Sequence, residues 1–300
     1  MEKKDLFIKK EKKYVIYHND LKFKTLRNLD PKKIEWDSKE IEKLYYNENL
    51  DTIDYRLKEC ETNNYEYFDL SHLNLKKMPD INKNIKKRIK YLFLNNNELE
   101  NMGDLRDYEN LEVLDISNNN ITYIHYLPPK LIELCCKYNN VTEIQNLEYL
   151  KILDCSMNKL KNVGHYPELE ILFCSNNKIS SIPNFTKLKK IICNNNNIRE
   201  IQIYNNLVYL ECSNNPIIKI GKSPHILDLI CRNTQIKKLP TCLNNLKYLE
   251  IFENKIEILE HYPKLKELYC DIDGIKNISE KYVIHNYKQY DNKYMILLFK

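Results

Sequence analysis

A short apolar motif recurs along most of the chain, and it limits the fold more than any other feature of the sequence. From about residue 65 the pattern L-x-x-L-x-[L/C]-x-x-N-x-[L/I]-x-x-[I/L] occurs eleven times, at spacings of 24, 22 and 20 residues, then 19 five times, 20 and 19. A unit this short cannot bury its own apolar face, so neighbouring units must stack. The copies begin at Tyr65, Ile89, Leu111, Leu131, Leu150, Leu169, Leu188, Leu207, Ile226, Leu246 and Leu265.

The ninth position of the motif is asparagine in eight copies, which predicts a structural ladder. Because side chains alternate along a strand, the first, fourth and sixth positions point inward. Where the chain leaves the strand, buried backbone groups need partners, and an Asn side chain can both donate and accept. Thr234 and Asp273 take this position in the ninth and eleventh copies, and Leu73 takes it in the first. The predicted ladder comprises Asn97, Asn119, Asn139, Asn158, Asn177, Asn196, Asn215 and Asn254.

These motifs resemble the leucine-rich repeats, over roughly residues 65–280. The resemblance implies an α/β-type leucine-rich-repeat solenoid with a curved parallel β-sheet on its concave face. A repeat of 19 residues leaves too few for a full helix on the convex side. We therefore expect extended or single-turn segments there, with prolines such as Pro128, Pro167 and Pro183 among them. The composition and cysteine usage are also similar to those of repeat proteins from AT-rich genomes, such as giant DNA viruses.

Seven of the ten cysteines fall on the inward sixth position. Stacked strands lie about 4.8 Å apart, whereas the sulfurs of a disulfide lie about 2 Å apart. Zinc requires four ligands arranged as a tetrahedron rather than a line. We interpret the column as small buried hydrophobic residues, and we expect no metal and no cofactor. Cys135 should lie on the concave face and be the most accessible thiol of the repeats. The column consists of Cys136, Cys155, Cys174, Cys193, Cys212, Cys231 and Cys270.

The third and fifth positions should point out of the concave face. Of these 22 positions eight are acidic, and only Lys190 is basic, although the whole chain carries a net charge of +5. Such a face would repel a phosphate backbone and attract a basic protein surface. Aromatic residues commonly anchor protein interfaces. The predicted partner-binding residues are Tyr91, Phe93, Asp115, Glu133, Ile152, Asp154, Ile171, Phe173, Ile192, Tyr209, Glu211, Tyr248, Glu250 and Tyr269.

A structural alternative remains for the same residues. They could pack against one another across neighbouring strands and do no more than stabilise the sheet. The sequence does not decide between these two interpretations, and it does not reveal the oligomeric state.

The ends of the chain do not carry the repeat. Residues 1–64 predict a mixed N-terminal cap, with two short strands around His18, a helix from Ser38 and a second helix spanning Glu48 to Cys60. The repeats should occupy residues 65–278, and residues 279–300 should form a C-terminal cap. Residues 1–64 could instead form a separate adaptor module.

The sequence favours a binding protein over an enzyme. We expect a non-enzymatic scaffold for a protein partner with a basic surface, with no nucleic acid on the concave face. The alternative is an adaptor for ubiquitin-type machinery, in which residues 1–64 recruit a second protein. The 64 and 22 flanking residues leave no room for a catalytic domain. The first residues carry charges where a signal peptide would have its apolar run. No apolar stretch of 18 residues exists, so we expect no membrane span. We therefore expect a cytoplasmic protein, in the host cytoplasm if it is viral.

Overall fold

The structure is a computed structural model that describes residues 52–271, 277–278, 284–290 and 294–299. The chain divides into two units, 1–50 and 51–300, and the second holds all the described residues. The strands predicted around His18, the helix predicted from Ser38 and the ladder position Asp273 lie outside them. The assignment of residues 1–64 as a cap or a separate module therefore stays a prediction.

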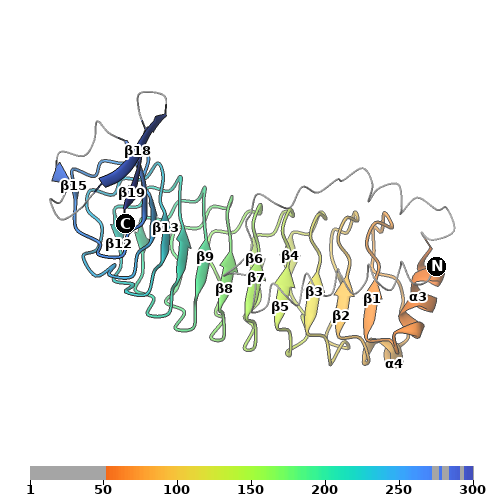
Figure 1. Cartoon of the computed structure of the whole chain (residues 1–300). Coiled ribbons are helices and arrows are strands. Elements are labelled where there is room, and N and C mark those ends of the chain that lie inside the picture. Colours follow the sequence, from red (N-terminus) through yellow and green to blue (C-terminus); the bar gives the residue numbers. More distant parts are fainter. Residues whose placement is uncertain (1–51, 272–276, 279–283, 291–293, 300) are drawn as a thin grey trace, which may run out of the picture. The chain divides into compact units, whose positions relative to one another are not determined.

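Eleven short parallel strands, one per repeat, lie side by side in the main sheet (Figure 1). Every one begins at the third motif position, so the fold predicted from the repeat is confirmed. The strands are β1 (Tyr67–Asp69), β2 (Tyr91–Phe93), β3 (Val113–Asp115), β5 (Glu133–Cys135), β7 (Ile152–Asp154), β8 (Ile171–Phe173), β9 (Lys190–Ile192), β11 (Tyr209–Glu211), β13 (Asp228–Ile230), β14 (Tyr248–Glu250) and β16 (Glu267–Asp271).

The segments that return from one strand to the next are mostly extended, as the short repeat predicts. Three two-stranded parallel pairs lie on this side. The one described helix within the repeats is the single-turn α4 (Lys83–Lys86), which falls in the first and longest repeat, where 24 residues leave room for it. The pairs are β4 (Tyr123–Ile124) with β6 (Glu143–Ile144), β10 (Glu200–Ile201) with β12 (Lys219–Ile220), and β15 (Ile258–Leu259) with β17 (Asn277–Ile278).

Helix α3 (Ile53–Thr62) precedes the first repeat. The Thr52 side chain caps it by accepting a hydrogen bond from the Tyr55 N–H at 3.2 Å. Residues 48–51 of the helix predicted from Glu48 to Cys60 lie outside the described residues, and its remainder is confirmed. Its residue Cys60 is buried in the apolar core, and Ile53 and Leu57 pack against that core. The helix thus covers apolar surface at the start of the solenoid, which would otherwise meet water.

A hairpin follows the last repeat. Strand β19 (Tyr294–Phe299) pairs antiparallel with β16, and β18 (Ile284–Tyr290) pairs antiparallel with β19. The main sheet therefore ends in two strands whose direction breaks the parallel repeat. This pairing leaves β16 with a neighbour on each side, so that it is not an open edge.

The asparagine side chains at the ninth position connect each repeat to the one before it. The Oδ1 of Asn119 accepts a hydrogen bond from the Leu99 N–H at 3.0 Å. Its Nδ2 donates to the carbonyl of Leu94 in the preceding repeat at 2.9 Å and to that of Ile116 in its own repeat at 3.1 Å. The same bonds to both repeats recur at Asn97, Asn139, Asn158, Asn177, Asn196 and Asn215.

The ladder changes at the ninth repeat. Thr234 stands in place of asparagine there, and the Ile217 N–H donates instead to the carbonyl of Asn215 at 2.8 Å. The shorter side chain does not span the distance that an amide spans. Asn254 in the tenth repeat again donates to the sixth-position carbonyl of the preceding repeat, that of Cys231, at 2.6 Å. Its oxygen accepts from the Thr234 N–H at 3.1 Å.

The residue before each ladder position has a left-handed backbone, which the repeat pattern did not predict. In all ten repeats where it is described, the eighth position has a φ between 47° and 58°. Asn tolerates this region better than other residues with a side chain. The recurrent Asn-Asn pair thus has two separate causes, a left-handed turn and then a buried ladder residue. The Asn members of this column are Asn96, Asn118, Asn176, Asn195, Asn214 and Asn233.

Candidate functional site

The third and fifth positions of the eleven parallel strands form one continuous surface, which we call the strand face. The register aligns equivalent residues of neighbouring repeats, for example Ile152 with Ile171 and Asp154 with Phe173. Since side chains alternate along a strand, both columns lie on the side opposite the core. All fourteen predicted partner-binding residues belong to this face.

These side chains are less exposed than the sequence suggested. None is fully exposed, and four of the fourteen are buried: Phe93, Glu133, Ile171 and Glu250. Large side chains on strands this close pack across the sheet. Tyr248 and Tyr269, on neighbouring strands, have ring centroids 5.2 Å apart. Part of the aromatic content therefore stabilises the sheet, in agreement with the alternative interpretation of cross-strand packing.

The middle of the strand face combines apolar side chains with one amine. Lys190 is the single basic residue of the third and fifth positions. Its Nζ lies 5.3 Å from the ring centroid of Phe173 and 4.7 Å from that of Tyr209. A cation above an aromatic ring is attracted by the ring's electron-rich face. Burial lowers the pKa of Lys190, and nearby Glu211 opposes this shift.

Two acidic residues of the face are held by neighbouring side chains. Glu211 accepts hydrogen bonds from the Asn194 Nδ2 at 2.6 Å and the Tyr209 hydroxyl at 3.1 Å. Glu250 forms an ion pair of 2.6 Å with Arg232 and accepts from a tyrosine hydroxyl. Arg232 is at the seventh position, just beyond the strand, so counting only the third and fifth positions omitted it. The face is accordingly less acidic than that count implies.

Two aspartates flank Cys135 across the sheet. The register aligns Asp115, Cys135 and Asp154 on three successive strands. Asp154 accepts a hydrogen bond from the Ser156 N–H at 3.0 Å, and burial raises its pKa despite that bond. Burial also raises the pKa of Cys135 well above its usual value, and the carboxylates on either side add to this shift. A thiol that resists ionisation is a poor nucleophile, so the trio gives no support to catalysis.

The seven cysteines at the sixth position are all buried. Burial raises the pKa of each, and Cys231 and Cys270 reach about 12. Their thiols occupy the place that leucine or isoleucine takes in other repeats, as expected for small hydrophobic residues. In the part of the chain that the structure describes, no group of histidine, cysteine or acidic residues could hold a metal ion.

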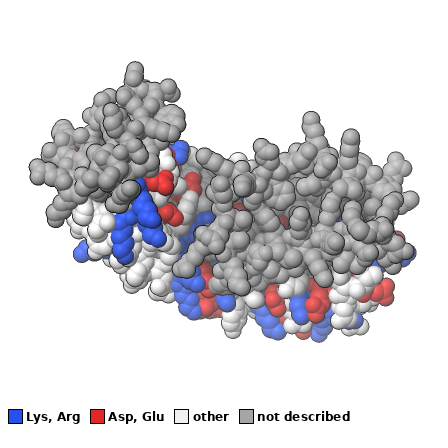
Figure 2. Space-filling model, in the orientation of Figure 1, with Lys and Arg blue, Asp and Glu red and all other residues white. Residues whose placement is uncertain are grey.

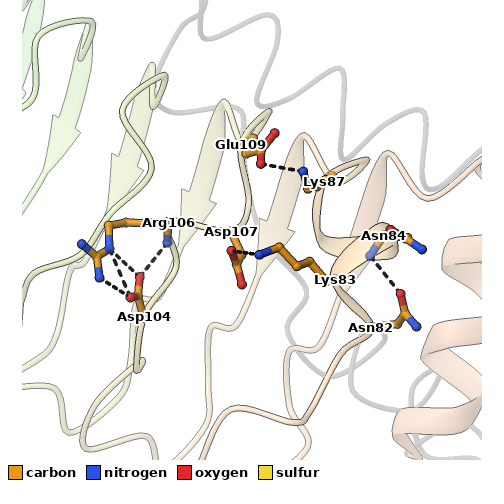
Figure 3. A network of polar contacts seen from close by, with 8 residues as sticks. All are labelled: Asn82, Lys83, Asn84, Lys87, Asp104, Arg106, Asp107 and Glu109. Carbon is orange, nitrogen blue, oxygen red and sulfur yellow. Dashed lines mark hydrogen bonds and ion pairs between the residues drawn. The ribbon is translucent and has the colours of Figure 1, made fainter.

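The return segments of the first two repeats carry a network of exposed ion pairs (Figure 3). Lys83 pairs with Asp107 at 3.1 Å, and Lys87 pairs with Glu109 at 2.8 Å, each across one repeat boundary. The Arg106 guanidinium donates hydrogen bonds to both carboxylate oxygens of Asp104, two residues earlier in the chain. Figure 2 shows basic and acidic side chains interspersed along the lower edge of the molecule. Exposed pairs of this kind contribute little stability, so this surface is mainly a solvated one.

Exposed aromatic residues lie on the return segments rather than on the strand face. Tyr123 and Tyr126 are 60% and 57% exposed. The Arg106 guanidinium lies 4.9 Å from the ring centroid of Tyr126, beside a shallow hollow that His125 also lines. Tyr123 and Tyr126 stand at neither the third nor the fifth motif position, so they were not among the predicted partner-binding residues.

Comparison with known proteins agrees with this geometry. A leucine-rich-repeat family model matches residues 110–134. No curated protein matches the sequence. Among the described residues, no helix is both long and apolar enough to cross a membrane.

Several solved structures are similar in fold. YopM of Yersinia pestis, a leucine-rich effector protein, is 21% identical with a TM-score of 0.60, over 75% of this chain and 74% of that one. A leucine-rich-repeat protein of Leptospira interrogans is 21% identical with a TM-score of 0.56, over 74% and 76%. The LRIM1/APL1C complex contains a chain that is 20% identical with a TM-score of 0.53, over 76% and 49%. Together with the repeat, this likeness identifies the chain as a protein of the leucine-rich-repeat fold.

Proposed function

We propose that the chain is a non-enzymatic scaffold that binds a partner protein on its strand face. The observation that carries the proposal is the apolar centre of that face, made by Ile152, Ile171, Phe173 and Ile192 on three adjacent strands. Ile152, Phe173 and Ile192 are half-buried, and Ile171 is buried beside them. Apolar and aromatic side chains in one patch supply the anchors that dominate the energy of protein interfaces. The similar structures include an effector protein and a two-protein complex, which is consistent with binding as the common role of the fold.

The charge around this centre favours a partner with a basic surface. Asp154 borders the centre on one side and Glu211 on the other. Lys190 and Arg232 offset part of this charge, so we expect the attraction to guide the approach of the partner more than to determine the affinity. A nucleic acid would have to bring its phosphates toward the same carboxylates.

An adaptor role for ubiquitin-type machinery requires residues 1–64 to recruit a second protein. Within that segment the structure describes only residues 52–64, where α3 packs on the core of the repeats. This packing fits a cap, and no described feature favours recruitment. We therefore retain the scaffold as the proposed function.

The proposal is tested by capturing a partner with the full chain and measuring its affinity for variants. Phe173→Ala combined with Ile192→Ala should weaken binding by about 2 kcal/mol or more, because both anchors are removed. Asp154→Lys combined with Glu211→Lys should mainly slow association and reduce its dependence on salt. The control is Lys219→Glu on β12, an exposed return residue, which should bind as the unmodified chain does. Equal weakening by the control, or normal binding by a folded Phe173→Ala, Ile192→Ala variant, would contradict the proposal.

A further inference from the structure

Two consecutive repeats depart from the asparagine rule at the left-handed eighth position. Tyr138 has a φ of 55° and Met157 a φ of 57°. Six of the ten described repeats have asparagine here. The two residues lie on adjacent turns, since the Tyr138 N–H donates to the carbonyl of Ser156 and the Asn139 N–H to that of Met157, at 3.1 and 3.3 Å.

At neither residue does burial of the side chain offset the cost of the left-handed backbone. Tyr138 is 47% exposed and Met157 is 38% exposed. A residue with a large side chain in the left-handed region costs roughly 1–2 kcal/mol relative to the usual backbone. Asparagine would lower that cost and would suit water better. Backbone strain that brings no gain in packing often marks a functional surface.

The turns that hold the pair carry only basic charge. The turns of the fourth to sixth repeats, positions seven to twelve, contain Lys137, Lys159, Lys161 and Lys178 and no acidic residue. The last three of these lysines are exposed, and none of the four has an ion pair within the described part of the chain. The Nζ of Lys137 lies 5.0 Å from the ring centroid of Tyr138. We call Tyr138, Met157 and these four lysines the turn patch.

The sign of the charge separates the turn patch from the strand face. The strands of the same three repeats carry Glu133 and Asp154 on the strand face, whereas their turns are purely basic. Lys159 and Lys178 make equivalent backbone hydrogen bonds in successive repeats. The Lys159 N–H donates to the carbonyl of Val141 at 2.9 Å, and the Lys178 N–H donates to that of Leu160 at 2.8 Å, in each case in the preceding repeat. Lys159 and Lys178 thus occupy the same motif position in adjacent repeats and form a lysine row across them.

We propose that the turn patch is a second interaction surface, which binds an extended acidic peptide segment carrying apolar side chains. The lysine row would pair with the carboxylates, and Tyr138 and Met157 would contact the apolar residues. An extended peptide alternates its side chains between two sides, so acidic residues on one side can follow the row while apolar ones face the pair.

A single-stranded nucleic acid fits this surface less well. Nucleic-acid platforms stack successive bases on several aromatic rings, and the turn patch has one ring, Tyr138. The thioether side chain of Met157 offers no flat surface for stacking.

The test uses the full chain and four labelled probes in fluorescence anisotropy. They are a short peptide alternating Glu with Leu, one alternating Glu with Ser, one alternating Lys with Leu, and an oligouridylate of similar length. We expect the Glu-Leu peptide to bind most tightly. Lys159→Glu combined with Lys178→Glu should weaken the binding of this peptide by about tenfold or more, which is about 1.4 kcal/mol. The matched control is Lys219→Glu combined with Lys222→Glu, two exposed return residues, which should change little.

A second variant separates binding from folding. Tyr138→Asn combined with Met157→Asn restores the residue found in most repeats. It should raise the urea midpoint of unfolding, because the backbone strain is reduced. It should also weaken binding of the Glu-Leu peptide by about tenfold. The inference is overturned if the Glu-Leu peptide does not bind, if the control pair weakens it equally, if Tyr138→Asn, Met157→Asn leaves its affinity unchanged, or if the oligouridylate binds more tightly. Since none of these residues lies on the strand face, the result is independent of the proposed function.

Discussion

The interior columns of the repeats and the strand face follow opposite rules of sequence. Along the interior, the same residue type recurs at the same position, as asparagine does at the ladder and cysteine at the sixth position. Along the strand face, residues one repeat apart range from Phe173 to Asp154 to Cys135. An interior residue packs against equivalent groups of the two adjacent repeats at every turn, so the same residue type satisfies the packing and hydrogen bonding in each repeat. A face residue has no such repeated requirement, and its variation can serve recognition instead.

The largest expected effect is on stability, from the interior ladder. Asn177→Ala removes an acceptor from the Leu160 N–H and a donor from the carbonyls of Cys155 and Cys174. Groups left without partners in the interior cost roughly 1–3 kcal/mol, and urea unfolding measures this loss. The matched control is Asn176→Ala, one residue earlier and exposed, which should cost only about 1 kcal/mol because its φ is 57°. Equal losses would show that Asn177 is not a ladder residue.

Exchanging a thiol for a hydroxyl should separate the two regions next. Cys174→Ser buries a hydroxyl in the apolar column and should destabilise the chain by about 1–2 kcal/mol. Cys135→Ser changes a face residue between two aspartates, which can accept its hydrogen bond, and should change the stability by less than about 0.5 kcal/mol. Thermal unfolding of both variants gives the comparison. A larger loss at Cys135 than at Cys174 would contradict the assignment of the two thiols to different environments.

Thiol labelling tests the same contrast without mutation. Of the ten cysteines, Cys135 and Cys242 are half-buried and eight are buried. With a maleimide reagent and no denaturant, mass spectrometry should find these two modified first. The raised pKa of Cys135 makes its labelling speed up as the solution becomes more alkaline. Fast modification of all ten thiols in the native protein would disprove the buried column.

A smaller effect is expected from a carboxyl on the face. Burial raises the pKa of Asp154 above 3.8, so the folded chain holds this proton more tightly than the unfolded chain does. The charged form therefore costs stability above the folded pKa, and this cost disappears as the pH falls toward about 3.8. Asp154→Asn should raise the stability at neutral pH by less than about 1 kcal/mol, and the gain should vanish at low pH. A gain that grows on acidification would contradict this sign.

The repeat predicted the fold almost completely, because one spacing rule applies at every turn. The strands begin at the third position in all eleven repeats, and the returns are extended. The burial of Phe93 and Ile171 on the face was not predicted, since alternation determines the direction of a side chain but not what packs over it. The contact between Arg232 and Glu250 was missed for a related reason, because it joins the seventh position of one repeat to the fifth of the next.

The turn patch shows a different limit. The Asn-Asn pair was understood as one ladder residue and a neighbour, so the left-handed role of the first asparagine was not recognised. Once that role is known, Tyr138 and Met157 stand out as exceptions in the sequence itself. A backbone angle, which composition and periodicity do not report, was needed to give the exceptions a meaning.

The most direct test of the strand face is hydroxyl-radical footprinting of the unmodified chain with and without a captured partner. Phe173 and Tyr209 report on the strand face, Tyr123 and Tyr126 on the return segments, and Tyr138 on the turn patch. If the strand face binds the partner, oxidation of Phe173 and Tyr209 should fall several-fold in the complex, while that of Tyr123 and Tyr126 stays the same. Protection of Tyr123 and Tyr126, with Phe173 and Tyr209 oxidised as fast as before, would contradict the proposed binding surface.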